Sequence, residues 1–216
     1  MTLTIDAVAF DLDGVLTDTA RAHYRAWKRL ADSLGIPFDE VANEALKGVD
    51  RIVSLQLILG DRPGFDAARR ADLAATKNAW YLEEITKVGP ADLFPGAAIA
   101  LDACREAALG IALASASRNA SLLLDRLGIA DRFDAVVDPA SVAVGKPAPD
   151  IFLAAAAALG AAPARTLGVE DSAAGVAAIR AAGMPSLGVG DIGVLGDADR
   201  VIPAIAAFDL ADYTSG

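Results

Sequence analysis

The chain has 216 residues, of which 54% are hydrophobic and 22% are charged. This length predicts one large domain or one domain carrying a smaller insert, and the composition excludes an intrinsically disordered chain. Nineteen basic residues against 29 acidic ones give a formal net charge of -10, which repels a phosphate backbone, so nucleic acid is not an expected partner.

Short apolar runs that end in a polar or acidic residue recur along the chain. The first covers residues 5–10 and ends at Asp11, which is typical of a buried strand that delivers a carboxylate at its C-terminal end. Four more predicted strands follow at residues 109–115, 135–137, 166–169 and 185–189. Predicted helices lie between them at residues 119–127, 150–159 and 172–182. This alternation predicts an α/β fold, a doubly wound parallel sheet with helices on both faces.

Residues 19 to 87 do not follow this alternation. Candidate helices there cover residues 23–34, 39–47, 50–59 and 66–85, with breakers that contain Gly and Pro between them. The pattern predicts a helical insert after the first strand, joined to the rest of the chain by two linkers. We therefore expect a core domain of residues 1–16 and 89–216, and a small helical cap domain of residues 17–88.

Three features of the sequence concern location. The single cysteine, Cys104, cannot form an internal disulfide, which favours a reducing compartment. The nearly uncharged stretch 151–164 contains Gly160 and Pro163 and is shorter than the ~20 residues that a membrane span needs. Residues 1–6 contain no basic leader. We expect a soluble cytoplasmic protein without a membrane partner.

Two acidic pairs stand at predicted strand ends. Asp11 and Asp13 are two residues apart, so both side chains can enter one cavity, and Gly14 permits the sharp turn that follows. Glu170 and Asp171 end a later strand, and parallel strands open onto one crevice at their C-terminal ends. Such a cluster requires a proton or a cation, and its oxygen ligands favour Mg²⁺ over zinc. Alternatively, the second pair only caps the next helix.

Two weaker signals add an anion site. Ser115 ends a predicted strand and Ala116 and Ser117 open the next helix, so a hydroxyl and free backbone N–H groups can face a phosphate. Lys146 precedes a stiff Pro-Ala-Pro segment that would hold its ammonium group near the crevice. Taken singly, an exposed serine and a solvated lysine are the commoner explanations. The order of the two elements along the chain favours the phosphate site.

These elements, taken together, resemble the haloacid dehalogenase (HAD) superfamily of phosphotransferases over the whole chain. The four motifs that carry the resemblance are Asp11-Leu12-Asp13-Gly14-Val15-Leu16-Thr17-Asp18, Ser115, Lys146-Pro147 and Glu170-Asp171. Within the superfamily, the sugar phosphomutases match further stretches, namely residues 17–19, 46–51, 77–78, 114–119, 148–152 and 168–172. Two residues depart from the mutase pattern, because Arg118 stands where lysine is expected and Asp50 where serine is usual.

The resemblance implies roles for individual residues. Asp11 is the implied nucleophile and Asp13 the implied general acid and base. One Mg²⁺ is implied, with ligands from Asp11, the main-chain carbonyl of Asp13, Glu170 and Asp171. Further implied substrate-binding residues are Thr19, His23, Trp27, Lys47, Gly48, Val49, Arg51, Ser54, Lys77, Ser115, Ala116, Ser117, Arg118, Asn119 and Lys146. Against this, a lone histidine and a tryptophan are more often packed residues, and an arginine at a helix start is often solvated.

The implied activity is that of an isomerase acting on small sugar phosphates. It would interconvert β-D-glucose 1-phosphate and β-D-glucose 6-phosphate through an aspartyl-phosphate and β-glucose 1,6-bisphosphate, with the bisphosphate also serving as primer. We expect a monomer. Two alternatives stay open, a sugar-phosphate phosphatase of the same fold and a catalytically silent binding module, and the intact Asp11, Asp13, Lys146 and Asp171 argue against the second.

Overall fold

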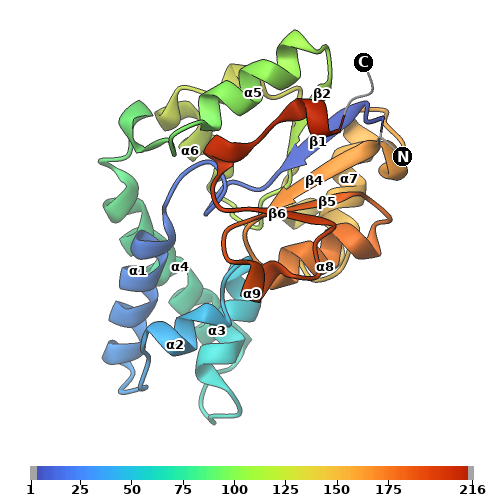
Figure 1. Cartoon of the computed structure of the whole chain (residues 1–216). Helices are drawn as coiled ribbons and strands as arrows, with labels where there is room; N and C mark the ends of the chain where they lie inside the picture. Colours follow the sequence, from blue (N-terminus) through green and yellow to red (C-terminus); the bar gives the residue numbers. More distant parts are fainter. Residues whose placement is uncertain (1–3, 214–216) are drawn as a thin grey trace.

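The computed structural model describes residues 4–213. Residues 1–3 and 214–216 lie outside the described residues. The sequence analysis assigns both segments to the core domain, and residues 1–3 also belong to the segment that it describes as lacking a basic leader. A parallel sheet in the order β3-β2-β1-β4-β5-β6 forms the centre of the fold (Figure 1). Its strands are β1 (Ala7–Phe10), β2 (Gly110–Leu113), β3 (Ala135–Val136), β4 (Thr166–Glu170), β5 (Ser186–Val189) and β6 (Arg200–Ile202).

Helices cover both faces of this sheet, which confirms the predicted doubly wound α/β class. On β1, Val8 and Phe10 pack into the apolar cluster that includes α5 and α6, whereas Ala9 packs into the opposite cluster with α7 and α8. All four residues of β1 are buried, as a strand covered on both sides requires. The covering helices are α5 (Ala97–Glu106), α6 (Ala120–Leu127), α7 (Asp150–Ala158) and α8 (Ala173–Ala181).

Several elements extend the predicted pattern. The sequence analysis assigned no residue range to β6, to the short helix α9 (Ile192–Leu195) or to α5. Two of the three residues of β6 are not buried, so this edge strand lacks the apolar run that identifies the inner strands. Short 3-10 helices lie at Pro90–Asp92, Ala130–Arg132, Pro139–Ser141, Pro163–Arg165, Ile205–Ala207 and Leu210–Asp212.

The inserted segment forms four helices with an apolar cluster of their own. They are α1 (Ala20–Ser33), α2 (Glu40–Glu44), α3 (Arg51–Leu59) and α4 (Ala67–Ile85), and Figure 1 shows them grouped beyond one edge of the sheet. Leu30, Leu55 and Leu59 are fully or almost fully buried among them. We call this group the cap and the rest of the chain the core. The exact boundary of 17–88 stays a prediction.

One predicted cap helix is wrong in its extent. The sequence predicts a helix over 39–47, but α2 ends at Glu44 and tighter turns follow, with Leu46 N donating to Asn43 O and Val49 N to Leu46 O. Leu46 is buried against the cap cluster, and Gly48 adopts a φ of +70°, a conformation that ends a helix. The chain therefore bends at Gly48 and directs the next residues toward the core.

The two linkers between cap and core lie side by side. Thr17 and Leu93 form an antiparallel bridge, the Thr17 hydroxyl donates to Asp92 O at 2.8 Å, and Phe94 N donates to Leu16 O at 2.9 Å. The outgoing and returning segments are thus hydrogen-bonded to each other where the cap begins. Within residues 4–213, no helix combines the length and apolar character that crossing a bilayer would require.

Candidate active site

The C-terminal ends of β1, β2 and β4 open onto a cavity of ≈ 380 Å³ between core and cap. Asp11 follows β1, Ser115 lies just beyond β2, and Asp171 follows β4. Parallel strands place these three side chains at one edge of the sheet. The cavity is lined by Asp11, Asp13, Gly14, Asp18, Ala20, Arg21, His23, Trp27, Asn43, Leu46, Lys47, Gly48, Val49, Arg51, Ser54, Lys77, Ser115, Ala116, Ser117, Arg118 and Asp171.

Lys146 lies beneath the cavity between two acidic side chains. Its Nζ donates to Asp11 Oδ1 at 2.7 Å and to Glu170 Oε2 at 2.6 Å, and all three residues are buried. Burial alone would lower the pKa of Lys146, but the two carboxylates outweigh it and hold the pKa above the ordinary value for lysine. The ammonium group is therefore charged, and it partly balances the acidic cluster.

Glu170 is fixed by several donors. Its Oε1 accepts hydrogen bonds from Asp171 N at 3.2 Å, Ser172 N at 3.1 Å and the Ser172 hydroxyl at 2.9 Å. The same hydroxyl caps α8 by accepting from Gly175 N at 3.1 Å. A β-carbon on Gly175 would lie 1.9 Å from the Glu170 carboxyl carbon, so glycine is required there. The N-cap of α8 is therefore Ser172 and neither member of the acidic pair, while the other oxygen of Glu170 contacts Lys146.

Asp11, Glu170 and Asp171 could hold a metal ion together. Each offers a carboxylate oxygen, and the three oxygens lie within 4.8 Å of one another. Burial, with the neighbouring carboxylates, raises the pKa of Asp11 to about 7 and that of Asp171 to about 9. Gly14 has a φ of +84°, and a β-carbon there would lie 1.9 Å from Asp171 Oδ2, so only glycine admits this carboxylate. An all-oxygen donor set with excess negative charge fits Mg²⁺.

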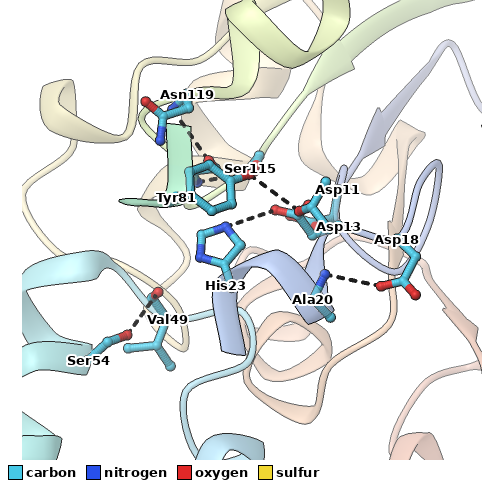
Figure 2. A network of polar contacts seen from close by, with 12 residues as sticks. Asp11, Asp13, Asp18, Ala20, His23, Val49, Ser54, Tyr81, Ser115 and Asn119 are labelled. Carbon is cyan, nitrogen blue, oxygen red and sulfur yellow. Dashed lines mark hydrogen bonds and ion pairs between the residues drawn. The ribbon is translucent and has the colours of Figure 1, made fainter. Parts of the chain in front are cut away.

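Asp13 lies in different surroundings from Asp11. Its Oδ1 accepts a hydrogen bond from the Thr19 hydroxyl. Its Oδ2 lies 3.9 Å from Nε2 of His23, and Figure 2 shows these two side chains facing each other. Burial is the main reason why the pKa of Asp13 rises to about 6. Both neighbours of this carboxylate come from the cap side of the chain. Asp13 is thus separated from the cluster by its partners, although it is only two residues from Asp11.

The half-buried His23 and the buried Lys77 form a pair behind Asp13. Lys77 Nζ lies 2.8 Å from His23 Nδ1 and 4.5 Å from the centre of the Trp27 ring. Burial, together with the positive charge of Arg51, lowers the pKa of Lys77 to about 7. Burial and the positive charges of Lys77 and Arg51 lower the pKa of His23 well below its usual range, so its ring is neutral. When Lys77 is protonated, its ammonium group can only donate to Nδ1, and the proton of the neutral ring is then on Nε2, facing Asp13.

Tyr81 is a site residue that sequence reasoning missed. The centre of its ring lies 4.0 Å from the centre of the His23 ring (Figure 2). Its hydroxyl donates to Thr19 Oγ1 at 3.4 Å. The side chain is fully buried. Tyr81 stands four residues after Lys77 on α4, so the two share one helix face, and this spacing could have identified it.

Most of the predicted substrate-binding residues line the cavity, and the others contact residues that line it. On the cap side, Lys47 is exposed and pairs with Glu44 at 2.8 Å, whereas Ser54 is buried and donates to Val49 O at 3.4 Å. Thr19, Asn119, Lys146 and Glu170 contact other site residues without lining the cavity. The resemblance did not assign Ala20, Arg21 or Asn43, which do line it. The catalytic and binding roles stay predictions.

One predicted element at the anion site is wrong. The sequence analysis has Ala116 and Ser117 opening a helix, but α6 begins at Ala120 and a turn precedes it. In this turn Ser115 Oγ accepts from Ser117 N at 3.1 Å, and Ser117 Oγ accepts from Asn119 N at 3.3 Å. Serine hydroxyls that bond to the backbone two residues on compete with helix formation. The result is a short loop between β2 and α6 that lines the cavity.

Three comparisons with known proteins agree on the kind of protein. A family model described as haloacid dehalogenase-like hydrolase matches residues 5–183. A β-phosphoglucomutase of Bacillus subtilis is 47% identical over 199 residues, which cover 91% of this chain and 88% of the relative. A fructose-1-phosphate phosphatase of Escherichia coli is 31% identical, covering 83% of this chain and 94% of the relative. A crystal structure of a Clostridium difficile β-phosphoglucomutase, 39% identical, has a TM-score of 0.93 and covers 95% and 94%.

Metal binding at the carboxylate cluster should release protons. With the pKa of Asp11 raised to about 7 and that of Asp171 to about 9, the metal-free cluster carries protons at neutral pH that a cation must displace. The apparent affinity for Mg²⁺ should therefore rise from about pH 6 to about pH 8, by up to about tenfold per unit for each proton displaced. Calorimetry in two buffers of different ionisation enthalpy measures the protons released. An affinity that does not change over this range contradicts the prediction.

Lys77 should make the stability of the fold depend on pH. Its pKa is about 7 in the folded chain against an ordinary value of 10.5, so between these values the unfolded chain binds a proton that the folded chain lacks. Stability must then rise with pH across this window, by up to ~1.4 kcal/mol per unit. Denaturant unfolding of the native chain and of Lys77→Met should show this slope as a difference between them. Lys87→Met, at an exposed lysine, is the control and should keep the native slope.

Proposed function

The chain belongs to the haloacid dehalogenase-like hydrolase family, and we propose that within it the chain is a β-phosphoglucomutase, interconverting β-D-glucose 1-phosphate and β-D-glucose 6-phosphate. One observation carries the proposal. Two carboxylates two residues apart, Asp11 and Asp13, lie in separate surroundings at the floor of one cavity whose cap side carries Arg51. A nucleophile, a proton donor and a holder for a second phosphate are what this reaction needs.

Asp11 is the proposed nucleophile. Attack of its carboxylate on phosphorus forms an aspartyl-phosphate and divides one transfer into two easier ones. Lys146, already within 2.7 Å of Asp11, and the Ser115 hydroxyl would bind the oxygens of the transferring group. A Mg²⁺ ion held by Asp11, Glu170, Asp171 and the main-chain carbonyl of Asp13 would supply neutralising charge.

Asp13 is the proposed acid and base. When the sugar oxygen leaves Asp11-bound phosphorus, a protonated Asp13 would give it a proton, and the ionised form would later take the proton of the attacking hydroxyl. Burial raises the pKa of Asp13 to about 6, which brings both forms within reach near neutral pH. Thr19 and His23 would hold the carboxyl group in place from the cap side.

The cap would supply what distinguishes a mutase from a phosphatase. A phosphoenzyme must survive until a sugar hydroxyl arrives, so the sugar phosphate, and not water, should complete the closure of the cap. Arg51 would bind the phosphate that is not being transferred, and the binding energy would align Asp13. The proposed intermediate, β-glucose 1,6-bisphosphate, must then turn around in the site, because Asp11 serves both sugar positions.

Three further proposals concern the setting of the enzyme. The net charge of -10 disfavours nucleic acid as a partner, so small sugar phosphates are the proposed ligands. A monomer is proposed because the cavity is completed by the cap of the same chain. A cytoplasmic location rests on the unpaired, buried Cys104.

A primer should remove a lag in the time course. If Asp11 must be phosphorylated before it can donate to glucose 1-phosphate, the resting enzyme begins slowly. Adding β-glucose 1,6-bisphosphate or acetyl phosphate should abolish the lag in a coupled assay for glucose 6-phosphate, with phosphorus NMR identifying the product. Asp11→Asn should show no turnover with or without primer. Release of inorganic phosphate without a lag and without glucose 6-phosphate would reject the mutase and favour a sugar-phosphate phosphatase.

Arg51 should matter for the sugar phosphate and not for a small substrate. In Arg51→Ala, kcat/KM for β-glucose 1-phosphate should fall by about 100-fold or more, since a buried charged contact to phosphate is lost. Hydrolysis of an aryl phosphate, which has no second phosphate, should change less than about threefold. Arg69→Ala removes an exposed arginine of α4 and serves as the matched control. Equal losses on both substrates would show that Arg51 does not hold a second phosphate.

A further inference from the structure

The two residues that depart from the mutase pattern face each other across the mouth of the cavity. Asp50 stands at the start of α3 in the cap, and Arg118 lies in the turn between β2 and α6 of the core. Arg118 Nε and Asp50 Oδ2 are 3.6 Å apart, which makes them an ion pair. The Asp50 side chain is only 18% exposed, and that of Arg118 is 45% exposed. Each departure, unexplained when read singly, thus has the other as its partner.

Asp50 has two tasks, and only one of them needs a charge. Its Oδ1 accepts a hydrogen bond from Ile52 N at 2.7 Å and so caps α3, while the other oxygen faces Arg118. The serine that is usual at this position would cap the helix equally well, because serine and aspartate are both favoured N-caps. The dipole of α3 also favours a negative charge at this end of the helix, but only the carboxylate offers a second oxygen that pairs with Arg118.

The segment around Asp50 rests on three loops of the core. Where a β-carbon on Gly48 would be, Ser172 Oγ is 2.4 Å away, and the corresponding position on Gly145 is 3.8 Å from the β-carbon of Asp50. The loop that carries Arg118 is the third. Among residues 4–213, two ion pairs join the cap to the core. One is Asp50–Arg118, and the second is His23–Asp13, in which the histidine ring is neutral.

The charges near the pair explain why it forms. Arg51 and Arg118 line the same cavity, and burial together with the Arg118 charge lowers the pKa of Arg51. Two guanidinium groups that approach when the cap closes oppose closure, and Asp50 offsets that repulsion. A guanidinium group has five N–H donors, so Arg118 can pair with Asp50 and still donate to a bound phosphate, which lysine does less well.

We propose that the Asp50–Arg118 ion pair is a latch that holds the cap against the core and places Arg51 before the substrate arrives. The ion pair can form only while the start of α3 contacts the core, so it increases the fraction of molecules whose cap is closed. Asp50 is a positioning residue in this proposal, acting through closure of the cap. The latch itself does not depend on which sugar phosphate the enzyme uses.

The first test measures closure without substrate. Spin labels at Val41→Cys on the cap and Ile192→Cys on the core occupy exposed positions, 80% and 71% accessible, while the native Cys104 is fully buried. Electron paramagnetic resonance distances should show a smaller closed population in Asp50→Asn and in Arg118→Gln. Asp50→Asn retains a side-chain oxygen that can accept the N-capping hydrogen bond of α3. Arg118→Lys keeps the positive charge and should not reduce the closed population. High salt should reduce closure in the native chain and have no further effect in Asp50→Asn. Unchanged distances in both neutral variants would overturn the proposal.

The second test is a double-mutant cycle on turnover, and this arm rests on the proposed function. Asp50→Asn and Arg118→Gln should each lower kcat/KM for β-glucose 1-phosphate by about threefold to tenfold, mainly through KM, and the double variant should lose no more than the worse single variant. Losses that multiply would show that the two residues act independently. A native chain that makes no glucose 6-phosphate, yet opens in Asp50→Asn, would reject the proposed function and leave the latch standing.

Discussion

Three carboxylates approach one another at the C-terminal edge of the sheet, and the buried ammonium group of Lys146 lies against two of them. In a partly desolvated place, like charges at such distances repel strongly, and each carboxylate also loses its hydration. Lys146 offsets part of both costs for Asp11 and Glu170, and the N–H groups of Asp171 and Ser172 support Glu170 further. The remaining negative charge favours a cation at this cluster over apolar packing.

The two aspartates after β1 owe their different chemistry to different parts of the chain. Asp11 is surrounded by core residues, whereas the carboxylate of Asp13 faces Thr19 and His23, both from the cap side. Lys77 and Tyr81 of α4 fix those two neighbours in turn. Movement of the cap therefore changes the surroundings of Asp13 and leaves those of Asp11 intact. With the roles proposed above, the helical insert would control proton transfer at Asp13 without contacting Asp11.

The sequence predicted well those features that local pattern determines. The buried run before Asp11, the alternation of strands and helices and the acidic residues at strand ends follow from apolar periodicity and the geometry of parallel sheets. The sequence analysis did not predict contacts between distant segments of the chain. The spacing from Lys77 can indicate Tyr81 as a site residue, but no local pattern pairs Tyr81 with Thr19, or Asp50 with Arg118, because each pair joins segments that are far apart in the sequence. The tight turns after Glu44 were also not predicted, because the burial of Leu46 against the cap cluster outweighs the local helix propensity.

The hydrogen-bonded linkers give the cap a pivot. Because Thr17 and Leu93 pair side by side, the cap is tied to the core along one short line, and twisting or sliding would break that pairing. Rotation about the line moves each part of the cap in proportion to its distance from it. The start of α1 and the end of α4 adjoin the linkers, whereas α2 and α3 lie at the far end, as Figure 1 shows. A rotation of a few degrees at Thr17 would therefore displace Arg51 much more than it displaces the ends of α1 and α4 beside the linkers, and the cavity would open most at the side farthest from the linkers.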